Sequence, residues 1–280
     1  MSPCLDTIGV PRGLAGNLAA LIRPSGPYDT KIVSGDMVTM TRTPQPESRD
    51  ADVRVAVSTV IFSVRRDADD EPVLSLPLVR RTRDPFGGRW ALPGGWLDAT
   101  EELDTAASRT LAETTGLTPS YLEQLYAFGA VDRSPTRVVS IVYWALLRSD
   151  EVDAQVAAHA RQGDAPENVE WFDATDLPPL AFDHNDIVEY TLWRLRNKVG
   201  YSRIAHGLLP DEFTLADLRE VNETILGKRL DPANFRRQVD TSNTLIPTER
   251  FRTGSHRPAR LYRYNRDVEL ADRGPLRSRH

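Results

Sequence analysis

The stretch from Gly95 to Leu117 holds carboxylates, an arginine and glycines at spacings that suit a bound phosphate and a metal ion. If this stretch is helical, positions 110, 113 and 114 stand three and four residues apart, so their side chains project from one helix face. Three carboxylates in that arrangement would hold Mg²⁺, which clamps a pyrophosphate and activates water. Here only Glu113 is acidic, because positions 110 and 114 are Thr110 and Thr114. This composition predicts weak metal binding and poor hydrolysis.

The same spacing resembles the signature of the Nudix hydrolase family, G-x5-E-x7-R-E-U-x-E-E-x-G-U, in which U is aliphatic. Seven positions agree with that pattern: Gly95, Glu101, Arg109, Leu111, Glu113, Gly116 and Leu117. Thr110 and Thr114 depart from it, because both positions are glutamate in the family. The upstream segment RWALPGGW is similar to family members that handle ADP-ribose. The resemblance implies a pocket for a nucleoside diphosphate without an intact catalytic set, which favours a receptor over an enzyme.

The remaining acids define the expected metal chemistry. Glu113, supported by Glu101, is the candidate metal ligand, and one or two carboxylates hold a divalent ion weakly. We therefore expect no required cofactor, with only a weak Mg²⁺ accompanying the nucleotide. Asp98 is expected to cap the helix, with Glu101 three residues later in a capping box, and Gly116 is expected to end it.

Arginines and tryptophans near the glycine pair offer phosphate charge and stacking surface. The candidate ligand-binding residues are Arg80, Arg81, Arg89, Trp90, Gly94, Gly95, Arg109 and Glu113, with Trp96 beside them. Three alternatives stay open: the helix could be a scaffold only, Trp90 could be a core residue beside a turn, and Arg109 could orient Glu113 instead of contacting a ligand.

An α/β layer sandwich is predicted to position this motif, and the Nudix resemblance implies that it is an α/β/α sandwich. Strands are expected at residues 53–64, 72–81, 90–92, 125–132 and 136–147, the last two forming a hairpin, and residues 169–178 are expected to form one more strand and a turn. Helices are expected at about 99–115 and 184–198. Leu103, Ala107 and Leu111 form the apolar stripe that seats the first helix on the sheet.

The C-terminal part has a different pattern, two helices followed by an arginine-rich hairpin. Residues 214–227 are amphipathic, residues 232–241 follow with Asp231 as N-cap and Pro232 at the first helical position, and the hairpin spans about 245–265. This order predicts a winged helix-turn-helix. Residues 228–266 contain ten Lys and Arg against three acidic residues, although the whole chain has a formal charge of −5. A basic end on an acidic chain indicates a polyanionic partner for that end.

The predicted second helix presents amide and guanidinium groups, which pair with base edges in a DNA major groove. The candidate DNA-binding residues are Thr214, Asn234, Arg236, Arg237, Gln238, Arg252, Thr253, Arg257, Arg260 and Tyr262. The hairpin arginines suit phosphate or minor-groove contacts. A solvated, charged pair of helices without a nucleic-acid partner is the alternative interpretation.

Residues 53–265 resemble the Nudix-related transcriptional regulators of NAD metabolism. The segments FTLADLREVNETILGKRLDPANFRRQV and RTGSHRPARLYRY carry this resemblance, and residues 179–215 are similar to the interdomain connector of that family. The resemblance implies a homodimeric repressor that leaves its double-stranded operator when ADP-ribose or a related nucleotide occupies the Nudix domain. The open alternatives are an active Nudix hydrolase with an accessory basic domain and an RNA-binding adaptor.

The bulk composition fits a globular protein, with 40% hydrophobic and 27% charged residues. Cys4 is the only cysteine, which excludes a disulfide framework, and no apolar run is long enough to span a membrane. We expect a cytoplasmic protein associated with the bacterial nucleoid.

The predicted parts are an extension at 1–52 that is disordered or loosely packed, a Nudix-like domain at 53–182, a linker helix at 183–205, a winged helix at 206–266 and a tail at 267–280. Met1, Met37 and Met40 are all possible translation starts.

Overall fold

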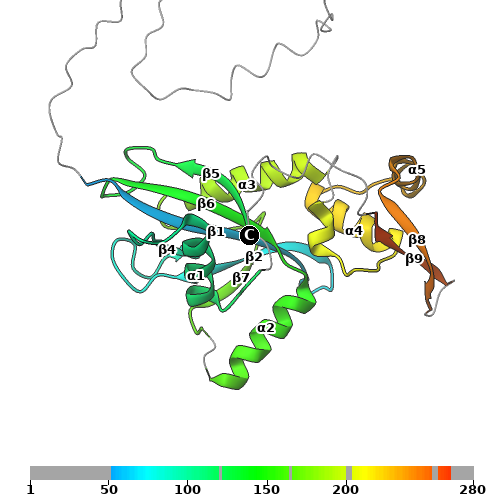
Figure 1. Cartoon of the computed structure of the whole chain (residues 1–280), viewed down its shortest axis with the longest axis horizontal. Helices are drawn as coiled ribbons and strands as arrows, with labels where there is room; N and C mark the ends of the chain where they lie inside the picture. The colour runs from blue at the N-terminus through cyan, green and yellow to red at the C-terminus, as the bar shows by residue number, and fades with distance from the viewer. Residues whose placement is uncertain (1–51, 120–121, 164–165, 200–203, 254–257, 266–280) are drawn as a thin grey trace, which may run out of the picture. The chain divides into compact units, whose positions relative to one another are not determined.

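The computed structural model describes residues 52–119, 122–163, 166–199, 204–253 and 258–265 (Figure 1). The predicted extension up to residue 51, the tail and Arg257 lie outside these residues. Seven strands form the main sheet: β1 Arg54–Arg66, β2 Pro72–Arg80, β3 Trp90–Ala91, β4 Gly94–Trp96, β5 Glu123–Phe128, β6 Val138–Leu146 and β7 Val169–Asp173. The predicted strand 125–132 ends early, at Phe128, whereas the strand and turn predicted at 169–178 are found as β7 followed by a turn after Asp173.

Strand β1 organises this sheet. It runs parallel to β6 from Arg54 to Phe62, and β5 continues the sheet beyond β6 as an antiparallel partner. On its other edge β1 pairs antiparallel with β4 at Ala56–Ser58 and with β2 at Ser63–Arg66. The β-branched sequence of β1 suits a strand that is covered on both faces, and the predicted hairpin of β5 with β6 is confirmed.

The alternation of side chains along β1 separates two apolar layers. Val57 and Ile61 pack with α1 (Leu103–Thr115) on one face, whereas Val60 and Phe62 pack with α3 (His184–Val199) on the other. This alternation follows from the two-residue period of a strand. Figure 1 shows α1 in front of the strands and α3 on their far side. The predicted α/β/α sandwich is confirmed.

One helix of the sandwich was not predicted from the sequence. Helix α2 spans Ser149–Gln162, and Val152 is its only fully buried residue. The helix buries little apolar surface, since Val156 and three of its four alanines are exposed.

A second group of elements follows α3. The short 3₁₀ helix η1 (Ile204–Leu208) leads to α4 (Leu215–Leu226), α5 (Pro232–Ser242) and the hairpin of β8 (Leu245–Arg252) with β9 (Ala259–Tyr264). These are the elements of a winged helix-turn-helix in the predicted order. Asp231 caps α5 with Pro232 in its first turn, as predicted.

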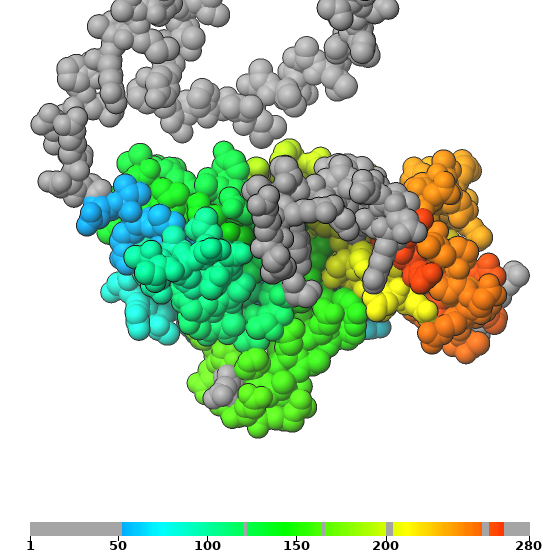
Figure 2. Space-filling view, in the orientation of Figure 1, coloured from blue at the N-terminus to red at the C-terminus, as the bar shows by residue number. Residues whose placement is uncertain are grey.

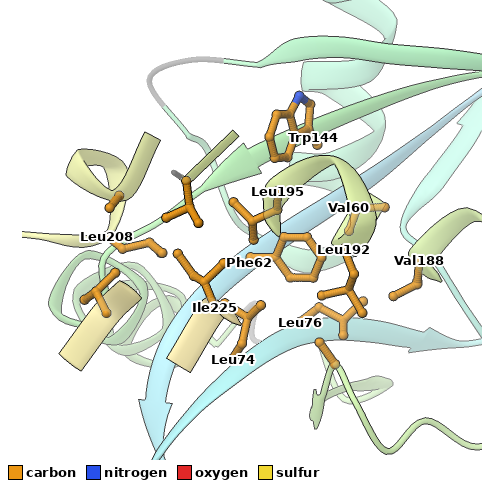
Figure 3. Packing of buried hydrophobic residues seen from close by; sticks show 14 of the residues in the cluster. Val60, Phe62, Leu74, Leu76, Trp144, Val188, Leu192, Leu195, Leu208 and Ile225 are labelled. Atoms are coloured by element: carbon orange, nitrogen blue, oxygen red, sulfur yellow. The ribbon is translucent and has the colours of Figure 1, made fainter. Parts of the chain in front are cut away.

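The apolar core continues from the sandwich into the winged helix. Leu218, Val221 and Ile225 of α4 belong to the same buried cluster as Phe62 and Leu195. Figure 3 shows Ile225 beside Leu74, with Phe62 and Leu195 next to them. On the surface of this junction Arg66 of β1 pairs with Glu220 of α4 at 3.0 Å. Within the described residues, no helix has the length and apolar character needed to cross a membrane.

Candidate functional site

Strand β4 brings the glycine pair against both β1 and α1. A Cβ atom on Gly94 would lie 2.2 Å from the carbonyl oxygen of Val57, and one on Gly95 would lie 2.7 Å from Cγ2 of Thr110. Both separations are shorter than real carbon contacts, so only glycine permits this approach. Gly94 therefore allows β4 to lie close to β1, and Gly95 allows β4 to lie close to α1.

Helix α1 begins later than predicted. Its N-cap is Glu102 and no side chain caps its first turn, so the capping box of Asp98 and Glu101 is wrong. The physical reason is that the carboxylate of Glu101 accepts two hydrogen bonds from Arg109, at 2.8 Å from Nε and 2.7 Å from Nη2. These bonds hold the pKa of the Glu101 carboxyl below its usual value. At the other end Gly116 terminates the helix with φ 71°, as predicted.

The three positions of the expected metal face have different environments. Thr110 is buried beneath Gly95, and Thr114 donates its hydroxyl to the backbone oxygen of Thr110 at 2.6 Å. Glu113 is exposed, and its carboxylate lies 3.2 Å from Nη1 of Arg109. Arg109 thus forms ion pairs with both candidate metal ligands, Glu101 and Glu113. This arrangement agrees with the alternative in which Arg109 orients Glu113. In the described ranges no three His, Cys, Asp or Glu side chains gather as a metal-binding group.

The predicted arginines upstream of the glycines hold the loop between β2 and β3. Arg80 donates to the backbone oxygen of Gly88 at 3.3 Å, and Arg81 donates to that of Pro85 at 2.9 Å. Partial burial lowers the pKa of the Arg81 guanidinium. Arg89 lies more loosely, 5.5 Å above the ring of Phe86.

The two tryptophans near the glycines differ. Trp90 is half-buried with its ring edge-on to Phe172 at 5.1 Å, which agrees with the core alternative. Trp96 is 44% exposed and carries the guanidinium of Arg54 3.6 Å above its ring. Trp96 is therefore the more accessible aromatic surface beside the glycine turn.

Two phenylalanines that the sequence analysis missed lie against each other in this region. Phe86 and Phe182 meet edge-to-face at 4.9 Å, and the guanidinium of Arg81 lies 4.8 Å above the Phe182 ring. Both phenylalanines have left-handed backbones, φ 67° and 56°, which costs a bulky residue about 1–3 kcal/mol. Such strain clusters at ligand clamps and switch regions. The only sequence signal was the turn-forming DPFGG segment around Phe86.

A buried polar network that the sequence analysis also missed lies behind the glycine turn. His184, the first residue of α3, accepts the N–H of Leu92 on Nδ1 at 2.9 Å. Its neighbour Asp183 pairs with Arg133 through two contacts of 2.8 and 2.7 Å. Burial is the main cause that lowers the pKa of His184 to about 4, with Arg133 and Arg81 acting in the same direction and Asp183 opposing them. His184 is therefore neutral at physiological pH.

In the winged helix, α5 turns its predicted contact residues outward. Phe235 and Val239 pack on the core at a spacing of four residues. Asn234, Arg236, Arg237 and Gln238 are all exposed. In Figure 2 the orange atoms of α5 and β8 lie together at the surface on the right of the view. Helix α5 can thus present amide and guanidinium groups to a major groove without disturbing its packing.

The remaining candidate DNA contacts on α4 and the hairpin have several partners within the protein. Thr214 is buried and caps α4 in a capping box with Asp217. Arg252 forms two contacts of 2.8 Å with the same Asp217. Tyr262 pairs its backbone with Phe213, which fastens the hairpin to the start of α4.

Two hairpin candidates remain open to solvent. Arg260 is exposed over the ring of Phe251, and Thr253 is exposed at the hairpin end. Arg252 is also exposed but is paired with Asp217, whereas the recorded contact of Arg260 is the ring of Phe251.

Comparison with known proteins identifies the family. Residues 54–191 match the NUDIX domain, and residues 205–264 match the NrtR DNA-binding winged helix domain. The ADPR responsive transcriptional repressor NtrR of Acinetobacter baylyi is 34% identical over 215 residues, which cover 75% of this chain and 81% of that protein. The chain belongs to the NrtR family of transcriptional regulators. The resemblance to Nudix-related regulators is therefore confirmed.

Two further similarities were found, one to an NrtR structure and one to a Nudix enzyme. The crystal structure of Shewanella oneidensis NrtR complexed with a 27mer DNA has a TM-score of 0.64 at 35% identity and covers 75% of this chain and 93% of that chain. The ADP-ribose pyrophosphatase of Methanocaldococcus jannaschii is 36% identical over 119 residues, 42% of this chain and 66% of that protein. A Nudix domain followed by a winged helix is confirmed as the fold. The nucleotide and DNA contacts of the individual candidate residues stay predictions.

Proposed function

We propose that this protein is a repressor of NAD metabolism genes that leaves its operator DNA when ADP-ribose, or a related nucleotide, binds its Nudix domain. The observation that carries this proposal is helix α1, in which Thr110 and Thr114 stand where a hydrolase needs carboxylates, while Gly94 and Gly95 are kept. A sensor must bind its ligand and release it unchanged. The similarity to the ADPR responsive repressor of Acinetobacter baylyi supports the same function.

A gel-shift experiment tests the proposal. Genomic fragments that the purified protein retains, together with its own upstream region, serve as labelled duplexes. We expect retention of specific fragments, reversal by ADP-ribose and no reversal by AMP at the same concentration. Duplex RNA is the competitor that tests the alternative of an RNA-binding adaptor. Preferential binding of RNA, or release that ignores ADP-ribose, would contradict the proposal.

The nucleotide pocket is proposed to work without a required cofactor. Mg²⁺ would enter only with the nucleotide and would contact Glu113 weakly, because Arg109 already neutralises that carboxylate. The proposed place of action is the cytoplasm, at the bacterial nucleoid, where the operator is found.

The competing function is hydrolysis of ADP-ribose, which the similarity to an ADP-ribose pyrophosphatase favours. We expect the purified protein with millimolar Mg²⁺ or Mn²⁺ to hydrolyse ADP-ribose very slowly or not at all, because two of three metal-binding carboxylates are absent. Chromatography of the reaction products checks this, with an active Nudix hydrolase as positive control. Turnover in the usual enzymatic range of about 1–1000 s⁻¹ would establish the enzyme instead.

Helix α5 is proposed to read the bases, and the hairpin is proposed to hold the phosphates. Arg237→Ala should weaken operator binding by about 1–3 kcal/mol more than it weakens random-sequence binding. Arg260→Ala should weaken both alike and lower the salt dependence by about one unit of slope, because it removes one phosphate contact. Fluorescence anisotropy with operator and random duplexes at two salt concentrations measures both effects. If Arg260→Ala alone lost specificity, the roles of helix and hairpin would be reversed.

The repressor is proposed to act as a homodimer, because operators read by a single helix per subunit are usually two-fold. An exposed aromatic surface supports this proposal. Tyr126 on the edge strand β5 and Trp193 on α3 are 56% and 55% exposed, and Tyr190 lies within 5.6 Å of each ring. Large exposed apolar patches often mark protein–protein interfaces.

Light scattering tests the dimer and its surface. We expect a dimer mass for the wild-type protein and a monomer mass for Trp193→Asp and Tyr126→Asp. Val131→Asp is the control, since Val131 is 78% exposed and lies outside this aromatic surface. Dimeric aspartate variants would refute the surface, and a monomeric wild-type protein, with and without DNA, would refute the dimer.

A further inference from the structure

Residues 181–184, hereafter the linker entry, connect the candidate ligand site to helix α3. Phe182 touches Phe86 in the loop before β3, Asp183 pairs with Arg133, and His184 accepts the N–H of Leu92. In addition Ala181 donates its N–H to the carbonyl oxygen of Trp90 at 2.8 Å. The linker entry therefore contacts Phe86 and Trp90, which lie on either side of Arg89. It also contacts Arg133 in the loop between β5 and β6.

The contact made by His184 is the most direct of these. Leu92 is two residues before Gly94, and its backbone N–H is directed to a side chain 92 residues later in the chain. His184 is buried, so the polar N–H of Leu92 would find no water if the histidine withdrew. A shift of the glycine turn must therefore either carry the start of α3 with it or break a buried hydrogen bond.

The other end of α3 reaches the winged helix. Arg196 donates from Nε to the backbone oxygen of Ile225 at 3.1 Å, in the last turn of α4. Leu195 and Ile225 are fully buried in the same cluster, which Figure 3 shows closely packed around Phe62. Helix α4 ends at Gly227, a few residues before α5. One continuous helix thus joins the back of the glycine turn to the last turn of α4, the helix that precedes the proposed recognition helix.

We propose that His184 is the positioning residue that transmits occupancy of the nucleotide pocket through α3 to the DNA-binding helices. This inference rests on the proposed function. Phe182, next to His184, has a strained left-handed backbone, and its ring contacts Phe86 in the loop between β2 and β3. A movement of that loop can therefore change the backbone conformation of Phe182. Arg196 is the corresponding contact at the far end of the helix.

The measurement is the coupling factor, the ratio of operator affinities without and with saturating ADP-ribose. Allosteric coupling factors are typically about 5–150. His184→Leu removes the acceptor at similar volume, and we expect its coupling factor to fall towards one. His184→Asn keeps an acceptor, Oδ1, at the position of Nδ1, and we expect it to retain most of the coupling. Calorimetric titration with ADP-ribose checks that both variants still bind the ligand.

Arg196→Met provides a second test that does not depend on the fold tolerating a change at His184. It removes the bond to Ile225 far from the pocket, so we expect unchanged ADP-ribose affinity and a coupling factor reduced several-fold. Arg194→Met on the same helix is the matched control, because Nε of Arg194 has no hydrogen-bond partner among the described residues. We expect it to couple like the wild type.

The outcomes separate this inference from the proposed function. If ADP-ribose does not release wild-type protein from DNA, the proposed function fails before any variant is needed. If the wild type responds and the folded His184→Leu and Arg196→Met variants respond equally well, the inference is overturned. Equal loss in His184→Leu and His184→Asn would also overturn it, because the accepted hydrogen bond would then not be the decisive contact.

Discussion

Replacing Phe62 with alanine should lower the free energy of unfolding by about 3–5 kcal/mol. Phe62 lies in the middle of β1, is fully buried and is among the largest side chains of the core. Figure 3 shows its ring among Leu192, Leu195 and Ile225, which come from α3 and α4. The truncation would leave a cavity where the sheet, the linker helix and the winged helix meet.

Because the sheet, α3 and α4 share one buried cluster, the Nudix domain and the winged helix should both lose stability in Phe62→Ala. Urea unfolding followed by tryptophan fluorescence, which reports on the sandwich, and by operator binding, which reports on the winged helix, should give coincident transitions that both move in Phe62→Ala. Val156→Ala is the control, since Val156 of α2 is 47% exposed, and such surface changes usually alter stability by less than about 0.5 kcal/mol. Two separate transitions, only one of them shifted, would show that the domains unfold independently.

The local patterns of the sequence predicted most of the elements. The apolar spacing at residues 214–227 located α4 (Leu215–Leu226) to within one residue at each end, and the β-branched apolar run at 53–64 located β1. Helix α2 was not predicted. Most of its apolar residues are alanines, which offer little apolar surface, and Val152 is its only buried residue.

The candidate site was predictable only as far as its signals were local. The glycine pair and the two threonines of α1 could be read from spacing, and Gly116 terminates the helix as expected. The linker entry could not be read in the same way. His184 and Leu92 are 92 residues apart, and a hydrogen bond to a backbone N–H places no demand on the residue type at position 92. A single histidine ahead of an amphipathic helix gives no indication that it is buried or which atom it contacts.

The competition between Arg109 and a metal shows the same limit. Position 109 is eight residues from Glu101 and four from Glu113, and the sequence allowed a metal, a ligand phosphate or a salt bridge at this cluster. In the structure Arg109 bridges both carboxylates, at 2.7 and 3.2 Å. Only the three-dimensional arrangement shows that one guanidinium serves both acids.

The stability of the protein should fall as the pH is lowered from about 6.5 to about 4, and His184 should account for roughly 3 kcal/mol of that fall. In the unfolded chain His184 binds a proton near its ordinary pKa of 6.5, whereas burial lowers its pKa in the folded protein to about 4. Between these values the unfolded state binds more protons, so acid favours unfolding. The full contribution is present above pH 6.5 and is lost as the pH falls towards 4.

His184→Asn isolates this contribution from that of the other histidines and the carboxylates. Asparagine does not titrate and retains an acceptor for the N–H of Leu92, so the variant should be somewhat less stable than the wild type at pH 7 because it packs less surface. The difference in unfolding free energy between the two proteins should then shrink as the pH approaches 4. It should reverse if the difference at pH 7 is smaller than the stability that the wild type loses through protonation of His184. Urea unfolding at pH 7, 6, 5 and 4.5 measures that difference. A gap that stayed constant over this range would mean that His184 has the same pKa in the folded and unfolded states, which its burial against Leu92 argues against.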